Sequence, residues 1–83
     1  MAVTYIIRSE KTIKFYVGSS HFNDELKRIS DHNSGRVKYT KPGRPWQLVH
    51  VEYFEIYTEA RKRELFLKTG VGRKWIYKNF RDK

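Results

Sequence analysis

Residues 3–18 read VTYIIRSEKTIKFYVG, a pattern that predicts a β-hairpin. Val3–Arg8 and Ile13–Gly18 are rich in β-branched and aromatic residues, as strands are. The polar segment at positions 9–12 between them is short enough to be the hairpin loop. The chain therefore begins with two paired strands.

The register of this hairpin brings two tyrosines together. A four-residue loop at positions 9–12 pairs Tyr5 with Tyr16 across the two strands. Side chains alternate along a strand, so any even loop leaves both phenols on one face of the sheet. A cross-strand pair that only packs is the alternative.

The next segment predicts a helix that begins at Asn23 or Asp24 and runs to about Asn33. Gly35 suits the left-handed conformation that ends a helix. The apolar residues at helical spacing form its buried stripe: Phe22, Leu26 and Ile29.

The rest of the chain alternates loop, strand and helices. We expect a basic loop at Arg36–Pro45, a strand from Trp46 to about Ile56, a helix capped by Thr58 that runs to about Lys68 and stops at Gly70, and a last helix over Arg73–Phe80. The order is β-β-α-β-α-α, which predicts a small α/β domain spanning residues 1–83.

Composition narrows the class of protein. Lysine and arginine total 18 against 9 acidic residues, and the net charge of +9 on 83 residues attracts polyanions. A basic protein can also owe its charge to solubility, and charge alone does not separate DNA, RNA and acidic lipid. The chain has no cysteine, and no stretch reaches the roughly 18 apolar residues of a membrane span. We therefore expect a soluble, cytoplasmic protein.

Arg28 and His32 stand four residues apart on the first predicted helix, so they share the side that adjoins the apolar stripe. A guanidinium there suits a phosphate, because its fork can hold two oxygens at once. The alternatives are a surface arginine lying over apolar neighbours and a histidine favoured by the helix dipole.

Glu64 lies between Ala60 and Leu67 on the narrow apolar stripe of the second predicted helix. A carboxylate in that position is costly unless it is paired or binds a metal. An ion pair is the alternative, because Lys68 follows at i+4 and Arg61 precedes at i−3.

Asn79 also falls on an apolar face, at i+3 from Ile76 and i+4 from Trp75. A hydrogen bond to the backbone is the usual reason for such an asparagine. Together, the two phenols, the guanidinium, the imidazole and the inward carboxylate supply what phosphodiester hydrolysis needs. A proton acceptor activates water, a cation neutralises the phosphate, and a carboxylate holds a metal.

The motifs that carry these residues keep a recognisable order. They read Val3-Thr4-Tyr5, Tyr16-Val17-Gly18, Arg28, His32-Asn33-Ser34-Gly35, Arg44-Pro45-Trp46-Gln47-Leu48-Val49 and Glu59-Ala60-Arg61-Lys62-Arg63-Glu64-Leu65-Phe66-Leu67-Lys68. This set resembles the GIY-YIG nuclease superfamily. Within it, the set is similar to small single-domain proteins like the N-terminal nuclease domain of the excinuclease C subunit.

The resemblance implies a three-stranded antiparallel sheet flanked by helices, with the active site on one sheet face. It implies that Glu64 binds a single divalent cation, Mg²⁺ or Mn²⁺, and that Arg28 holds the scissile phosphate. Tyr5 or Tyr16 would act as the general base or orient it, with Arg28 or a metal-bound water favouring the phenolate. His32 would assist by hydrogen-bonding a tyrosine or relaying its proton.

Three points of the resemblance depart from the family pattern or rest on spacing. Val3-Thr4 replaces the Gly-Ile of the first triplet, and the connection from Ser19 to Glu25 is about two residues longer than usual. Some members also use an asparagine in the last helix, and Asn79 is the residue here whose spacing suits that role.

The loop before the third strand is the expected nucleic-acid contact. Lys38, Lys41 and Arg44 form a flexible cationic arm next to Tyr39 and Trp46. We expect it to track the sugar-phosphate backbone with weak sequence preference and to lose affinity steeply with salt.

The overall expectation is a monomeric, metal-dependent endonuclease that acts on nucleic acid, with DNA favoured over RNA, and that has no membrane partner. One alternative is a non-catalytic basic DNA- or RNA-binding module on the same fold. Another is a ribosome-associated protein whose charge only docks it on RNA.

Overall fold

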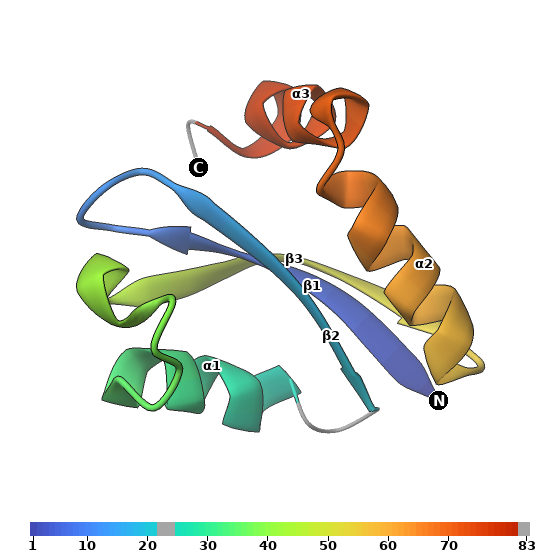
Figure 1. The fold of residues 1–83 in the computed structure, drawn as a ribbon, viewed down its shortest axis with the longest axis horizontal. Coiled ribbons are helices and arrows are strands. Elements are labelled where there is room, and N and C mark those ends of the chain that lie inside the picture. Colours follow the sequence, from blue (N-terminus) through green and yellow to red (C-terminus); the bar gives the residue numbers. More distant parts are fainter. Residues whose placement is uncertain (22–24, 82–83) are drawn as a thin grey trace.

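The computed structural model describes residues 1–21 and 25–81, which form a sheet with helices on both faces (Figure 1). In chain order the elements are β1 (Ala2–Ser9), β2 (Phe15–His21), α1 (Glu25–Ser34), the short 3-10 turn η1 (Lys41–Gly43), β3 (Trp46–Phe54), α2 (Tyr57–Leu67) and α3 (Gly70–Phe80). The expected α/β class and the order β-β-α-β-α-α are confirmed. Within the described residues, no helix is long and apolar enough to cross a bilayer.

β1 is the central strand of the sheet. The strand order is β2-β1-β3, and β1 pairs antiparallel with both neighbours. Residues 2–7 of β1 are all buried, because helices cover both faces of this strand. The antiparallel three-stranded sheet that the resemblance implies is confirmed, and β2 and β3 are its two edges.

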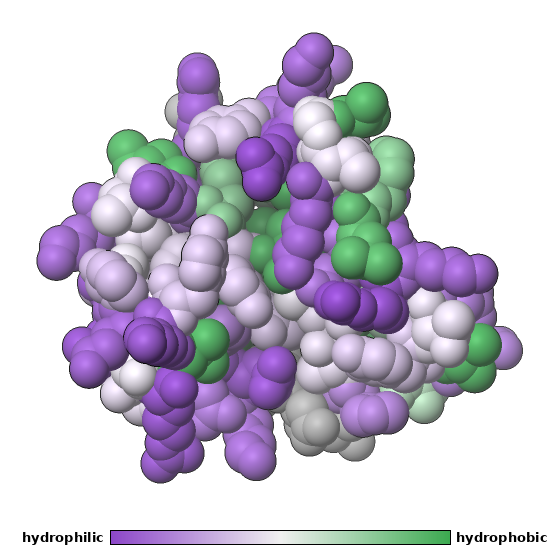
Figure 2. All heavy atoms as spheres, in the orientation of Figure 1, coloured by the Kyte–Doolittle hydropathy of each residue, from purple (hydrophilic) through white to green (hydrophobic). Residues whose placement is uncertain are grey.

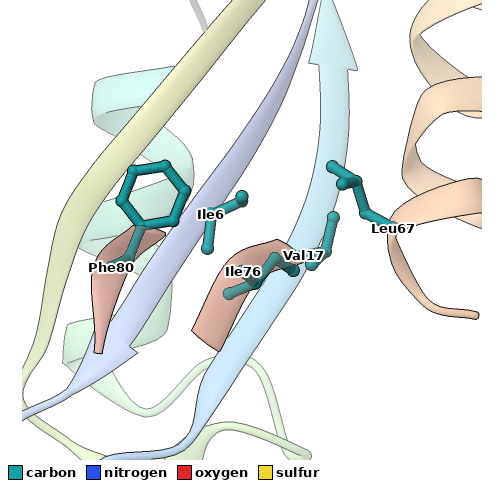
Figure 3. Packing of buried hydrophobic residues seen from close by; sticks show 5 residues of the cluster. All are labelled: Ile6, Val17, Leu67, Ile76 and Phe80. Carbon is teal, nitrogen blue, oxygen red and sulfur yellow. The ribbon is translucent and has the colours of Figure 1, made fainter. Parts of the chain in front are cut away.

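One face of the sheet is covered by α2 and α3. Burying each aliphatic or aromatic side chain of this core contributes roughly 1.5–3 kcal/mol. The cluster joins β1, β2, α2 and α3 (Figure 3), and its buried members are Ile6, Val17, Leu67, Ile76 and Phe80. This packing fixes α2 against β2.

The opposite face is covered by α1, which lies on the other side of the sheet in Figure 1. Tyr5 and Ile7 point to this face and pack with Trp46 of β3. Ile29 of α1 packs against the same cluster, as its place in the predicted stripe requires. The expected caps Asn23 and Asp24, together with Phe22 and the side chain of Leu26, lie outside what the structure describes.

The hairpin loop has the expected four residues, but it lies one position later, at 10–13. The Ser9 amide donates to the Lys14 carbonyl at 2.8 Å, so these two residues close the loop. The buried Ser9 hydroxyl accepts from the amides of Lys11 (3.1 Å) and Thr12 (3.0 Å), and Ile13 takes a left-handed conformation with φ 61°. Ser9 is therefore the last residue of β1, and its side chain stabilises the turn that follows.

This shift changes which residues face each other. Tyr5 pairs with Gly18 and Tyr16 pairs with Ile7, so the expected direct pair of Tyr5 with Tyr16 is wrong. The loop length remains even, so the two phenols still share one face of the sheet. Both phenols lie on the face covered by α1, and their pairs are two positions apart along the strands.

The boundaries of the last two helices also differ from those expected. α2 begins at Tyr57 with Ile56 at its N-cap and no side-chain cap bond, so Thr58 does not cap it. Gly70 does not stop α2, which ends at Leu67, but opens α3. α3 starts three residues earlier than expected because the Thr69 hydroxyl caps it, accepting from the Gly72 amide.

The loop after α1 is held to the body of the protein. Gly35 has φ 84° and ends α1, as predicted. Thr40 and Gly43 are buried: the Thr40 carbonyl accepts from the Trp46 indole (2.8 Å), and the Gly43 carbonyl accepts from the Ser9 hydroxyl (2.5 Å). The expected flexible arm is therefore anchored at two points.

Candidate active site

Tyr5 is fully buried in β1, and its phenol lies over Gly18 of β2. A Cβ at Gly18 would stand closer than 3.0 Å to both the hydroxyl and the Cζ of Tyr5, a separation that real side chains do not show. Glycine therefore lets the phenol extend across β2 toward the open edge of the sheet. The Tyr-Val-Gly motif has this steric basis.

A buried chain of hydrogen bonds leads from this phenol into α1 and the following loop. The Tyr5 hydroxyl lies 3.2 Å from His32 Nε2, and His32 Nδ1 lies 2.7 Å from the Thr40 hydroxyl. Thr40 donates its proton to the Val37 carbonyl, so it accepts from Nδ1–H. This assignment leaves Nε2 to accept the Tyr5 proton. The bond between His32 and a tyrosine that the resemblance implies is present.

Burial keeps both partners of that bond neutral. Burial raises the pKa of Tyr5 and outweighs the opposite effect of Arg28, whose guanidinium hydrogen-bonds the phenol. Burial also lowers the pKa of His32, and the charge of Arg28 lowers it further. Arg28 does favour the phenolate of Tyr5, as expected, but desolvation is the larger effect and the pKa of Tyr5 is raised overall.

Tyr16 is the more accessible of the two phenols. It is half-buried and borders a hollow of about 630 Å³. Its ring packs against His32, with centroids 4.8 Å apart, and the Lys68 ammonium lies 5.7 Å from the ring centroid. Tyr16 therefore touches both the buried chain of hydrogen bonds and α2's C-terminal end.

Arg28 is exposed on α1, beside the phenols. Partial burial acts to lower the pKa of Arg28, but the hydrogen bond to Tyr5 and the interaction with Tyr16 outweigh it and raise the pKa. The guanidinium is therefore a permanent cation that a phosphate can reach from solvent.

Glu64 projects from α2 toward β2 and is 4% exposed. Its Oε1 accepts from the Ser19 hydroxyl at 2.5 Å. Its Oε2 accepts from Arg61 at 2.7 Å and from Lys68 at 2.6 Å. The inward position is as expected, and the ion pairs with Arg61 and Lys68, which were the alternative to a bound metal, are present.

These contacts keep Glu64 ionised. Burial acts to raise the pKa of Glu64, but the hydrogen bonds from Lys68, Ser19 and Arg61 outweigh it and lower the pKa. A carboxylate has about four lone-pair sites, so three donors leave room for a cation. Among residues 1–21 and 25–81, no three acidic, histidine or cysteine side chains gather as a metal cage. The donor set therefore fits a single-carboxylate site, which Mg²⁺ tolerates when water and phosphate oxygens complete its shell.

The two halves of this constellation meet at the edge strand β2. Gly18 and Ser19 are neighbours in β2, so their side-chain positions face opposite sides of the sheet. The phenols approach on the α1 side, and Glu64 approaches on the α2 side through Ser19. Lys68 joins the two, because its ammonium binds Glu64 and also lies over Tyr16.

A model of the GIY-YIG catalytic domain matches residues 1–78, which is nearly the whole chain. The chain belongs to the GIY-YIG family. No solved structure matches it significantly.

Similar GIY-YIG proteins come from staphylococci and Listeria. A UPF0213 protein of Staphylococcus saprophyticus is 46% identical over 66 residues, covering 78% of this chain and 77% of its own. A UPF0213 protein of Staphylococcus aureus is 40% identical over 57 residues, covering 68% and 70%. One from Listeria monocytogenes is 48% identical over 46 residues, so the match spans about half of each chain (54% and 51%). The names of these relatives state no activity.

Asn79 does not lie where the sequence suggested. It is exposed on α3, whose buried residues are Gly72, Ile76 and Phe80. Its amide donates to the Trp75 carbonyl at 2.7 Å, which is the backbone alternative. We therefore leave Asn79 out of the GIY-YIG site.

The three loop cations Lys38, Lys41 and Arg44 are all exposed. Lys41 and Arg44 border a second hollow with Lys11 of the hairpin loop. The anchored loop thus presents its positive charge to solvent, away from the buried contacts that hold it.

The sequence did not indicate two residues of the candidate site. Ser19 orients Glu64, and Thr40 fixes the tautomer of His32. Ser19 directly follows the conspicuous Gly18, and alternation along the strand already places its side chain on the face opposite the phenols. Thr40 lies in an irregular loop, where no periodicity indicates its direction.

Proposed function

We propose that this protein is an endonuclease that hydrolyses the phosphodiester bonds of nucleic acid, with DNA as the favoured substrate. It would use one divalent cation, and a tyrosine would assist the attack of water. One observation carries the proposal. Glu64 and the phenols come from opposite faces of the sheet and yet meet around β2, through Lys68 and Tyr16. Burial is the main cause of the raised pKa of Tyr5, and the negative charge of Glu64 raises that pKa further.

Tyr16 is the phenol that we assign to the attacking water. It borders the hollow, whereas Tyr5 is fully buried. Arg28 and Arg61 both interact electrostatically with Tyr16, and Lys68 lies over its ring. To act as the base, Tyr16 must be a phenolate, which these cations would stabilise. The phenolate takes the water proton and becomes a neutral phenol as the water oxygen attacks phosphorus.

Arg28 would bind the phosphate, and the buried residues Tyr5 and His32 would position the groups that react. Arg28 binds the non-bridging oxygens of the phosphate and neutralises the charge that grows as water attacks phosphorus and the bond to the leaving oxygen breaks. Tyr5 and His32 act as positioning residues, because they hold Arg28 and the Tyr16 ring through direct contacts.

Glu64 would hold the cation, Mg²⁺ or Mn²⁺. When bound, such a cation supplies Lewis-acid stabilisation of the phosphate and the leaving oxygen. Ser19 keeps the carboxylate aimed at the β2 edge. Arg61 and Lys68 are about half exposed (49% and 43%), so they can move from Glu64 toward phosphate oxygens.

The test is nicking of supercoiled plasmid by the pure protein with Mg²⁺. Glu64→Gln should lower the rate by roughly 100-fold or more, as loss of one charge-stabilising group typically does. The matched control is Glu52→Gln. Glu52 also forms ion pairs, with Arg63 (2.8 Å) and His50 (2.9 Å), but it lies on β3. The control should keep its nicking activity.

Equal residual nicking in Glu64→Gln and the parent would reject this site. Tyr16→Phe tests the base: it should lose nicking as severely as Glu64→Gln, while binding of uncut DNA is retained. Retained nicking in Tyr16→Phe would assign the water to another group.

A non-catalytic nucleic-acid-binding module is the second candidate. The observation that favours it is that Glu64 already has three donors, as a purely structural carboxylate would. This candidate expects DNA binding without any Mg²⁺- or Mn²⁺-dependent nicking by the parent protein.

A further inference from the structure

The hollow of about 630 Å³ lies along the outer edge of β2, beside the active site. Its apolar part comes from Val17 of β2, Leu67 of α2 and Ile76 of α3. In Figure 2 this face has a hollow near its middle, with green atoms at depth and pale or purple side chains around it. The volume falls within the roughly 300–1,000 Å³ of small-molecule sites.

Four aromatic rings border this hollow in two pairs. The rings of Phe15 and Tyr77 are 5.3 Å apart at 83°, and those of Tyr16 and Tyr39 are 6.0 Å apart at 44°. Tyr39 is 82% exposed and Tyr77 is 48% exposed. Nucleobases stack on such exposed aromatic faces whatever their sequence.

The charge around the hollow is positive. Its charged residues are Lys14, Lys68 and Arg73, and no acidic residue among those that the structure describes lines it. Within the part of the chain that the structure describes, neither Lys14 nor Arg73 has an ion-pair partner. The hollow therefore combines stacking surfaces with cations that are available to a phosphate.

We propose that this hollow binds one unpaired nucleobase of the substrate strand, next to the scissile phosphate, with the attached phosphate on Lys14 and Arg73. Tyr16 and Lys68 belong to both the hollow and the active site, so the base would be a near neighbour of the cut. A base inside a duplex has covered faces and paired edges, so it enters only after unstacking. The inference rests on the proposed nuclease function and specifies its substrate: single-stranded, flapped or gapped nucleic acid rather than continuous duplex.

The experiment measures binding in the Glu64→Gln background, where cutting does not interfere. Fluorescence anisotropy compares a single-stranded DNA with a continuous duplex of the same sequence at fixed salt. The unpaired strand should bind about 10-fold more tightly. Replacing Tyr39 and Tyr77 together by alanine should remove that preference and leave the duplex affinity unchanged. A matching single-stranded RNA tests the same chemistry with the other sugar, and its preference should fall in the same variant.

A second readout follows the base itself. 2-Aminopurine in the unpaired strand should be quenched by the parent and not by the Tyr39→Ala, Tyr77→Ala variant. Tyr53→Ala is the matched control, because Tyr53 is similarly exposed (54%) but lies on β3, the opposite edge strand. Arg73→Gln, a change at an exposed residue that does not alter the apolar floor of the hollow, should lower affinity for the unpaired strand. It should also reduce the slope of log affinity against log salt by about 0.7.

The results separate this inference from the proposed function. Nicking by the parent without any preference for unpaired strands, or a preference that survives in the double variant, overturns the base pocket alone. A preference that disappears in the double variant, in a parent that does not nick, supports the pocket and rejects the nuclease.

Discussion

At the scale of single residues, Gly18 controls the position of the Tyr5 phenol. Gly18→Ala would place a methyl group closer than 3.0 Å to the Tyr5 ring and hydroxyl. Tyr5 is fully buried, so it has little room to move away. We expect a loss of about 1–3 kcal/mol in the free energy of unfolding, measured by urea denaturation, together with a loss of nicking.

The control for this change is Gly70→Ala. A Cβ at Gly70 meets no atom within 4 Å, and Gly70 is the first residue of α3. Alanine there should be neutral or stabilise by up to about 1 kcal/mol. Equal effects of the two substitutions would contradict the steric role of Gly18.

His32 makes the protein sensitive to mild acid. Burial, and then the charge of Arg28, lowers the pKa of His32 from 6.5. The unfolded chain thus takes up this proton at a higher pH than the folded protein does. The stability contribution of His32 is therefore full above about pH 6.5 and is lost as the pH falls toward the folded pKa.

We expect His32→Gln to lower stability by about 1–3 kcal/mol at pH 8, because buried hydrogen bonds are broken. The difference between parent and variant should narrow as the pH falls below about 6.5, since the parent alone carries this proton penalty. Urea unfolding between pH 5 and 8 measures it. Parallel profiles for parent and variant would show that His32 titrates normally.

At the scale of elements, Thr69 determines where α3 begins. Its hydroxyl accepts from the Gly72 amide at 3.2 Å and donates to the Phe66 carbonyl at 2.6 Å. Thr69→Ala should destabilise the protein by about 1 kcal/mol in urea unfolding. Thr58→Ala is the matched control, because α2 has no side-chain cap bond, and it should change stability by less than about 0.5 kcal/mol. A larger effect at Thr58 would contradict this assignment of caps.

At the scale of the whole molecule, the net charge of +9 should dominate nucleic-acid affinity. The anchored loop presents Lys38, Lys41 and Arg44 to solvent. Replacing all three by alanine should reduce the slope of log affinity against log salt by about 2–3, because each phosphate contact contributes about 0.9 for duplex DNA. Fluorescence anisotropy between about 50 and 200 mM salt measures the slope.

A charge-matched control for the loop variant lies on the helices of the opposite sheet face. Lys62 of α2 and Lys74 and Lys78 of α3 are exposed. Replacing these three by alanine should leave most of the salt slope intact. If the two triple variants lowered the slope equally, the loop would have no special role, and a flat salt response in the parent would reject electrostatic binding altogether.

Much of the fold could be predicted because it depends on local patterns. The β-rich segments, the helical spacing around Glu64 and the glycine after α1 each indicate an element without reference to the rest of the chain. Caps were harder to predict, since any threonine near the start of a helix is a candidate: Thr58 lies inside α2, whereas Thr69 caps α3. Thr69 acts as the cap because the chain after it turns so that the Gly72 amide reaches its hydroxyl.

The candidate site was predicted as a set of residue types, and most of its geometry was not. The sequence indicated an inward Glu64 and phenols on one face, because side-chain periodicity fixes direction. It did not indicate that Tyr5 is neutral, since desolvation depends on the neighbours that α1 and β2 bring to it.

The sequence by itself determined the order of elements, the positive charge and the identity of the chemical groups. Those properties follow from residue type and short-range spacing. The tertiary structure alone decided that the phenols and Glu64 meet around the β2 edge, and that Ser19 and Thr40 hold Glu64 and His32. It also formed the aromatic hollow, from segments that the sequence separates by up to sixty-three residues (Lys14 to Tyr77). Such contacts depend on strand register and helix packing. Both are determined by the burial of apolar side chains from distant parts of the chain, and no local sequence pattern specifies them.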